Sequence, residues 1–160
     1  MNPIAIRLLS QQLMSPQFAK PEEVVANMGA IQAQDYRMVR WAVAMRTKRP
    51  SIKAFRKAYD EGKIIRTHLL RCTWQLVASE DYGWMKLFAP KAKVTLKGWM
   101  HTNKIAIDEK EELAIRDILI ETALEYGNVT KKEFDHALQE RGIMMDDHRL
   151  RYHLILAEYS

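Results

Sequence analysis

The sequence predicts a mainly α-helical chain with one short β-ribbon, arranged as two units. Three observations indicate this fold class. Apolar residues recur at helical spacing along most of the 160 residues. Two short segments near the middle are instead rich in β-branched and aromatic residues. The net charge also changes sign near residue 104: residues 1–104 hold 18 Lys and Arg against 7 Asp and Glu, and residues 105–160 hold 7 against 13.

Four helices are expected before residue 63, each opened by a proline or by a capping side chain. Asp35 is placed to cap the third helix, and the apolar residues of that helix predict that it is largely buried. Gly62 is placed to end the fourth helix. The expected ranges are 3–14, 21 to between 29 and 31, 36–45, and 52–61. The first helix should carry one apolar stripe made of Ile4, Leu8, Leu9 and Leu13.

The β-ribbon is predicted over residues 64–67 and 72–77, where two short segments would pair as antiparallel strands. Helices followed by a two-stranded ribbon are the order of a winged helix. A long helical stretch should follow from residue 79 to about residue 100, with Pro90 kinking or breaking it. Residues 101–108 are expected to connect this first unit, residues 1–104, to a second unit, residues 105–160.

The second unit is expected to contain three helices. The first ends at Gly127, the second starts at a capping box formed by Thr130 and Glu133, and the third, residues 149–158, is capped by Asp146 or Asp147. Helix, short helix and then a helix with outward basic residues is the helix-turn-helix order, and a plain three-helix bundle is the alternative. The outward residues would be Arg149, Arg151 and His153. Because a winged helix would continue into a hairpin, the second unit is expected to be truncated.

Composition limits the classes of function. No apolar run approaches the roughly 20 residues that cross a bilayer, and the start lacks the order of a signal peptide, so we expect a cytoplasmic protein. A single cysteine, Cys72, excludes an internal disulfide, and the five histidines lack convincing metal-ligand spacing. We therefore expect no metal and no cofactor.

Eleven basic residues lie within 35 positions, between Arg37 and Arg71, and Trp41, Tyr59 and Trp74 are interleaved with them. Cationic side chains mixed with aromatic ones are typical of proteins that bind nucleic acid through phosphates and stacking. The alternative is a solvated helix face above core aromatics.

Two glutamines, Gln32 and Gln34, lie two positions apart at the joint between two predicted helices. In an extended segment their side chains would point the same way, whereas on a helix they would diverge by roughly 200°. Two neutral amides facing one way can converge on one water or one sugar. The alternative is two unrelated surface glutamines.

Three ordered motifs resemble the winged-helix DNA glycosylases of the AlkZ-like family: AIQAQDY (residues 30–36), IRTHLLRCTWQLV (65–77) and EDYGW (80–84). The resemblance implies tandem winged-helix domains around a DNA-binding cleft. Family members are usually more than twice this length, so the resemblance covers their N-terminal portion. The chain departs from the family pattern at Cys72, where many members have Pro or Gly, and at Gln75, where many have His.

The resemblance also implies an activity. Family members excise alkylated bases, including bases joined in interstrand crosslinks, and their catalytic motif of Gln, a hydrophobic residue and Gln matches Gln32 and Gln34. The chain would then be a monofunctional glycosylase acting on damaged double-stranded DNA, with Asp35 serving first as a helix cap. The expected DNA contacts are Arg37, Arg40, Arg66, Thr67, His68 and Arg71, while Trp41, Trp74 and Trp84 are expected to fill the core.

Other functions stay open at this point. The chain would also suit a non-catalytic winged-helix DNA-binding module or regulator, or an inactive truncated fragment. An all-helical domain that docks a protein through its acidic end is a further class, but it leaves the basic cluster and the motifs unexplained.

Overall fold

The computed structural model describes residues 2–159, except for the side chains of residues 88 and 89, and separates them into two compact units. The first unit is Met1–Ala89 and the second is Pro90–Ser160. The sequence analysis placed this boundary at residue 104. The division falls earlier because helix α6 (Ala89–Thr102) packs with the second unit, where Asn103 Nδ2 donates to Tyr152 Oη over 3.0 Å.

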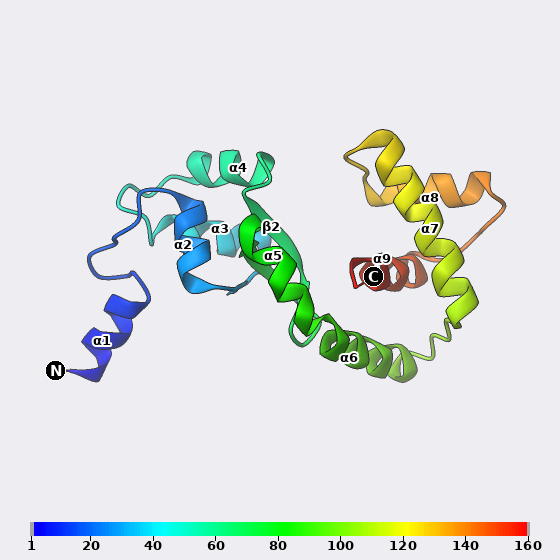
Figure 1. Cartoon of the computed structure of the whole chain (residues 1–160), viewed down its shortest axis with the longest axis horizontal. Coiled ribbons are helices and arrows are strands. Elements are labelled where there is room, and N and C mark those ends of the chain that lie inside the picture. The colour runs from blue at the N-terminus through cyan, green and yellow to red at the C-terminus, as the bar shows by residue number, and fades with distance from the viewer. Residues whose placement is uncertain (1, 160) are drawn as a thin grey trace. The chain divides into compact units, whose positions relative to one another are not determined.

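The first unit contains the expected helices and ribbon, and one strand that the sequence analysis did not predict (Figure 1). The segment ahead of the third helix forms a short strand, β1 (Ile31–Gln32), because it pairs with a strand more than forty positions later. The elements are α1 (Pro3–Ser10), α2 (Pro21–Met28), β1, α3 (Tyr36–Ala44), α4 (Ile52–Asp60), β2 (Ile64–Leu69), β3 (Thr73–Ala78), α5 (Ser79–Met85) and the 3-10 helix η1 (Lys86–Phe88).

The three strands form an antiparallel sheet in the order β1-β3-β2. Because side chains alternate along each strand, the sheet has two faces. One face packs on the main core of the unit, with Leu76 and Ile64 against Phe55 and Val24. The other face carries a smaller apolar cluster of Leu69, Val77 and Met85, the last of these from α5. The helical stretch after β3 breaks at η1, and Pro90 lies in the first turn of the helix that follows, so the predicted break near Pro90 is present.

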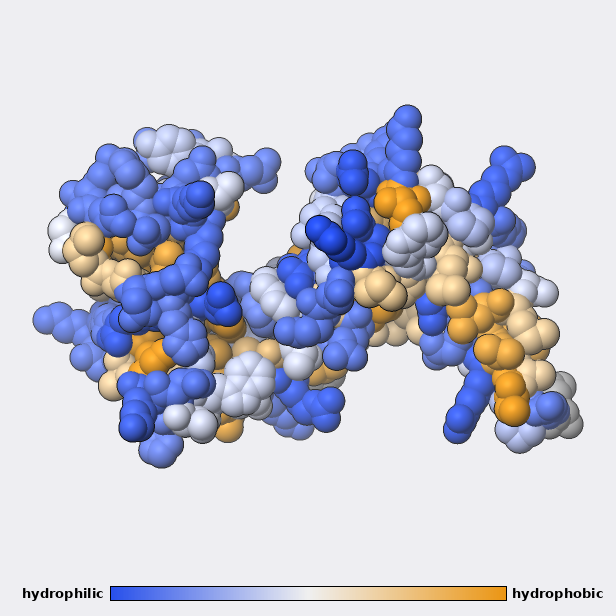
Figure 2. Space-filling view, turned by 180° about the vertical axis from the view of Figure 1, so that it is seen from behind, coloured by the Kyte–Doolittle hydropathy of each residue, from blue (hydrophilic) through white to orange (hydrophobic). Residues whose placement is uncertain are grey.

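Helix α1 is shorter than predicted, and its apolar stripe is not buried. The helix stops at Ser10 because the chain turns at Gln12, whose φ is 57°. It buries no residue and stands apart from the sheet and the other helices of its unit (Figure 1). Figure 2 shows the resulting row of apolar residues at the α1 end, where Ile4 is 66% exposed. None of the helices formed by the described residues is long and apolar enough to span a membrane.

The second unit holds α6, α7 (Glu109–Tyr126), α8 (Lys131–Glu140) and α9 (Asp147–Glu158). Its caps confirm the sequence prediction: Thr130 and Glu133 form a capping box, and Asp146 accepts from two amides at the start of α9. Its core is formed by Ile115, Leu119, Leu138 and Leu150.

The prediction that α9 presents three outward basic residues is wrong for two of them. His153 is 2% exposed and its Nε2 lies 2.9 Å from Glu111 Oε1. Arg149 is half-buried and donates to the same carboxylate over 2.7 Å. Only Arg151 of the three is exposed. Glu111 on α7 draws both side chains inward, and that partner is about forty positions away in the sequence.

Lys104 ends α6 in a conformation that suits glycine. Its φ is 56°, its amide donates to His101 O, and the next amide donates to Met100 O over 2.9 Å. Gly62 and Gly142 take the same place after their own helices. Because a Cβ is strained in this region, we expect Lys104→Gly to stabilise the second unit by about 0.5–1 kcal/mol, measured as a raised urea midpoint. As a control, Lys97→Gly inside α6 should cost about 1 kcal/mol. An unchanged or lowered midpoint for Lys104→Gly would contradict this account.

Candidate functional site

The glutamine pair lies on an extended segment, as its predicted shared direction requires. Gln32 is in β1 and Gln34 follows two residues later, and both are exposed, while Ala33 between them is 1% exposed. This alternation places both amides on the solvent side and the methyl group of Ala33 in the core. Neither amide makes a hydrogen bond to another of residues 2–159. Both amides are therefore free to bind a ligand.

The backbone beneath the two amides is held from several directions. Gln32 is in register with Gln75 of β3, and the Ala33 amide donates to Trp74 O over 2.8 Å. From β2, Arg66 Nε donates to Ala33 O over 3.0 Å and Arg66 Nη2 to Gln34 O over 3.4 Å. The segment thus has a held backbone beneath two exposed side chains, and a rigid supporting backbone suits a binding or catalytic site.

Asp35 caps α3, as predicted. Its Oδ1 accepts from the amides of Arg37 (2.8 Å) and Met38 (3.0 Å). The next residue, Tyr36, packs its ring against Tyr59, with 5.5 Å between ring centroids. A cap and an aromatic anchor therefore fix the end of the glutamine segment. An open hollow of about 620 Å³ begins here, lined by Gln34, Asp35, Tyr36 and Arg37.

The residues predicted to contact DNA fall into two groups. Arg37 and Arg71 are exposed, and Arg40 is half-buried with its guanidinium 5.1 Å from the Tyr36 ring centroid. Arg66 is half-buried, with its guanidinium Cζ 3.9 Å from the Trp74 ring centroid. Thr67 and His68 are 5% and 6% exposed. Burial leaves these two side chains little surface to offer to a phosphate.

Comparison with known proteins assigns the family. The family model "DNA glycosylase AlkZ-like" matches residues 25–159, which include the glutamine segment, all the strands and most of each unit. The chain belongs to the AlkZ-like DNA glycosylase family. A solved structure, the DNA glycosylase AlkZ of Streptomyces sahachiroi, is similar to it with a TM-score of 0.71 at 19% sequence identity. That similarity covers 96% of this chain and 42% of the AlkZ chain, and it shows a shared fold. A search of curated proteins found no significant match to the chain.

Gln75 is a polar residue beside the glutamine segment that the sequence analysis did not assign to the candidate site. It is 7% exposed and lies in register between Gln32 on one neighbouring strand and Thr67 on the other. Its Nε2 donates to Thr73 Oγ1 over 2.9 Å. The three in-register side chains form a polar row across one sheet face, because directly opposed residues share a face. The alternation of side-chain direction along residues 73–77 of the predicted strand could have placed Gln75 on the same face as Thr73 and Val77.

Two of the three tryptophans expected in the core are largely exposed in this AlkZ-like chain. Trp41 is 60% exposed and Trp84 is 51% exposed, whereas Trp74 is half-buried beneath Arg66. The prediction was wrong for Trp41 because the buried face of α3 is set by Val39 and Val43. Trp41 is two positions from each of these valines, so its side chain points about 200° around the helix from theirs. Counting apolar residues without their helical phase made this helix seem more buried than it is.

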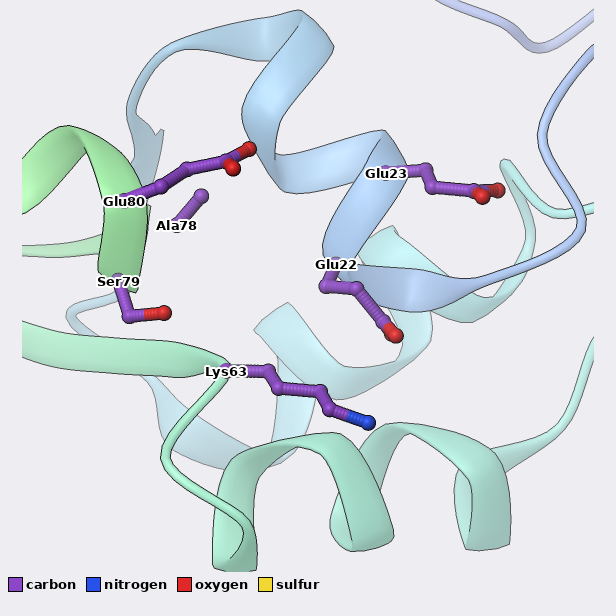
Figure 3. Close-up of a pocket in the computed structure, with 6 residues that line it drawn as sticks. All are labelled: Glu22, Glu23, Lys63, Ala78, Ser79 and Glu80. Atoms are coloured by element: carbon purple, nitrogen blue, oxygen red, sulfur yellow. The ribbon is translucent and has the colours of Figure 1, made fainter.

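A second hollow of the first unit is acidic (Figure 3). It has a volume of about 150 Å³ and is lined by Glu22 and Glu23 from the start of α2, by Ser79 and Glu80 from the start of α5, and by Lys63 and Ala78. In Figure 3 the carboxylate of Glu23 points away from the other lining side chains. Glu23 is already engaged, because its Oε2 accepts from the Lys20 amide over 3.0 Å. Among the described residues, no group of three His, Cys, Asp or Glu side chains is placed to hold a metal ion.

Proposed function

We propose that this AlkZ-like chain carries the catalytic glutamines of a monofunctional DNA glycosylase that excises alkylated bases. The observation that carries the proposal is the arrangement of Gln32 and Gln34, two exposed amides that flank a buried Ala33 on a fixed backbone. Membership of the glycosylase family supports it. The chain spans 42% of the AlkZ chain that it matches, and the activity is proposed for the whole protein.

The proposed reaction needs stabilisation of positive charge on the sugar rather than strong acid catalysis. Alkylation at N3 or N7 makes a purine cationic, so the C1′–N bond breaks with its electron pair moving to the base, which leaves neutral. The deoxyribose becomes oxocarbenium-like. The side-chain carbonyl oxygens of Gln32 and Gln34 would face this charge and hold a water, whose oxygen bonds to C1′ while its proton passes to solvent.

Neutral amides suit this substrate better than the adjacent carboxylate does. A damaged base that is already cationic needs no protonation, so the site can work without a group of raised pKa. Asp35 has its Oδ1 occupied by two backbone amides of α3. Moving it toward a substrate would remove the cap, at a cost of about 1 kcal/mol.

Two exposed arginines, Arg37 and Arg71, and the half-buried Arg40 supply the proposed contact with damaged double-stranded DNA. Arg37 lines the hollow beside Gln34, and Arg40 and Arg71 belong to the same unit. The proposed substrates include bases joined in interstrand crosslinks, as the family resemblance implies. We place the protein in the cytoplasm, on the nucleoid when bound. We also propose that both units are winged-helix domains.

A DNA-binding module without turnover is the second candidate. The basic first unit would bind a duplex by phosphate contacts alone. The deciding experiment is incubation of the whole protein with methylated duplex DNA, followed by chromatography of released bases. Release of N7-methylguanine or N3-methyladenine is expected. Salt-sensitive binding with no base release would overturn the glycosylase and leave the module.

Replacement of Arg37 tests the DNA contact separately. Each phosphate contact contributes about −0.9 to the slope of log K against log salt concentration. We therefore expect Arg37→Ala to make this slope shallower by about 1 in fluorescence-anisotropy titrations with duplex DNA. Lys110→Ala is the control, because Lys110 is exposed on the acidic first turn of α7. Equal slopes for Arg37→Ala and the parent chain would remove Arg37 from the interface.

A further inference from the structure

Arg66 reaches across the sheet to the glutamine segment. It lies on β2, which is separated from β1 by β3. Its guanidinium passes over β3 with Cζ 3.9 Å from the Trp74 ring centroid and donates to Ala33 O and Gln34 O on the far side. These contacts join residues 33 and 32 positions apart in the sequence. A half-buried arginine held in this way faces the protein rather than solvent.

The two acceptors belong to the two peptide groups that flank the Cα of Gln34. Ala33 O lies in the plane before this Cα and Gln34 O lies in the plane after it. Each peptide group is rigid, so holding both oxygens fixes φ and ψ of Gln34 and therefore the direction of its Cα–Cβ bond.

Only a planar, multiply donating cation can make this set of contacts. Arg66 stacks its guanidinium on Trp74 and donates from two nitrogens at once. A lysine carries one compact charge and neither stacks nor bridges two oxygens in this way. Hydrogen bonds from a charged donor are also the stronger ones.

We propose that Arg66 is a positioning residue, which fixes the backbone of Gln34 and so aims its side-chain amide at the substrate. The inference rests on the proposed function for its consequence, and on the contacts of Arg66 for its geometry. It assigns Arg66 a role different from a contact with the DNA backbone. A phosphate contact would require the guanidinium to leave Trp74 and the two carbonyls.

The first experiment measures amide hydrogen exchange by NMR, on the whole chain without DNA. In Arg66→Met we expect exchange at the Ala33 amide, which bonds Trp74 O, to rise at least about tenfold, because two charge-assisted hydrogen bonds are lost. Arg66→Lys, which keeps the charge and most of the stem, should show the same rise and decides the question if Arg66→Met does not fold. Arg56→Met, an exposed arginine of α4, is the matched control. Unchanged exchange at Ala33 in the folded variants would overturn the proposal.

The second experiment separates positioning from DNA contact by kinetics. In the whole protein, Arg66→Lys should lower kcat for base release by about 10- to 100-fold, with KM and the salt slope of DNA binding unchanged. A phosphate contact predicts the reverse, namely a raised KM, a slope shallower by about 1 in Arg66→Met, and a near-normal Arg66→Lys. If the parent protein releases no base, the proposed function fails, whereas the exchange measurement still decides the role of Arg66.

Discussion

Gln34→Ala is expected to lower base release from methylated duplex DNA by about 100-fold or more, with DNA affinity unchanged. The side chain is exposed and makes no hydrogen bond within residues 2–159, so its removal leaves the fold intact. In the proposed reaction, the substitution removes an amide oxygen that stabilises the charge developing on the sugar, and removing one such preorganised group typically costs two to three orders of magnitude in rate. The effect should therefore appear in kcat rather than in KM.

Single-turnover release of N7-methylguanine and anisotropy binding of the same duplex measure the two quantities. Gln11→Ala is the matched control, because Gln11 is an exposed glutamine at the end of α1. Gln32→Ala should behave like Gln34→Ala. The double variant should lose less than the product of the two single effects, since both amides act on one sugar. Weakened DNA binding with normal turnover of bound substrate would instead make Gln34 a contact residue.

Local signals were sufficient to predict most helices of this chain and their ends. Asp35, Thr130 and Asp146 cap the helices that were expected after them, and the glycines at 62 and 142 end the helices that precede them. These features depend on residues within about five positions of one another. The β-ribbon was predictable for the same reason, because its two strands are joined by a short turn.

Features that depend on distant partners were not predictable. The two residues of β1 form a strand only through β3, and the sequence between them contains two helices. His153 and Arg149 were read as outward because their partner Glu111 lies on another helix. For the glutamine pair, alternation predicted the shared direction of the side chains. The contacts of Arg66 with their backbone come from 33 positions away and had no local signal.

The contact of Glu111 with α9 leads to the second large expected effect, a loss of stability in Glu111→Gln. Glu111 accepts from Arg149 over 2.7 Å and lies 2.9 Å from His153 Nε2, which must carry the proton because a carboxylate only accepts. His153 is 2% exposed. In Glu111→Gln, the carboxylate is replaced by a neutral amide whose NH2 group can only donate, so one of its two polar atoms no longer accepts from the Arg149 guanidinium. Breaking a fully buried pair costs 3–5 kcal/mol, and partial exposure of Glu111 and Arg149 reduces our estimate to about 2 kcal/mol.

The stability of the second unit should also decrease as the pH is lowered, because the protonation of Glu111 and that of His153 both destabilise the folded state. Burial raises the pKa of Glu111, but hydrogen bonds from Arg149 and His153 outweigh it and hold the pKa below its usual value. The contribution of Glu111 is therefore present above its unfolded pKa, roughly 4.3, and is lost as pH falls through the lowered folded value. Burial lowers the pKa of His153 despite its bond to Glu111. Below pH of about 6.5 the unfolded imidazole binds a proton that the folded one does not, so stability falls there too.

Urea unfolding of the chain between pH 4 and 8 measures both effects. The parent chain should lose stability progressively below pH of about 6.5, and Glu111→Gln should start about 2 kcal/mol lower at pH 7 with a shallower dependence below pH 5. Glu121→Gln is the matched control: Glu121 lies 3.5 Å from Arg141 with both side chains well exposed, so its loss should change stability by less than about 0.5 kcal/mol. Equal effects of the two glutamate substitutions would show that Glu111 acts as a surface charge. Stability that rises on acidification from pH 7 would show that His153 is charged in the folded chain, contrary to the lowered pKa that its burial produces.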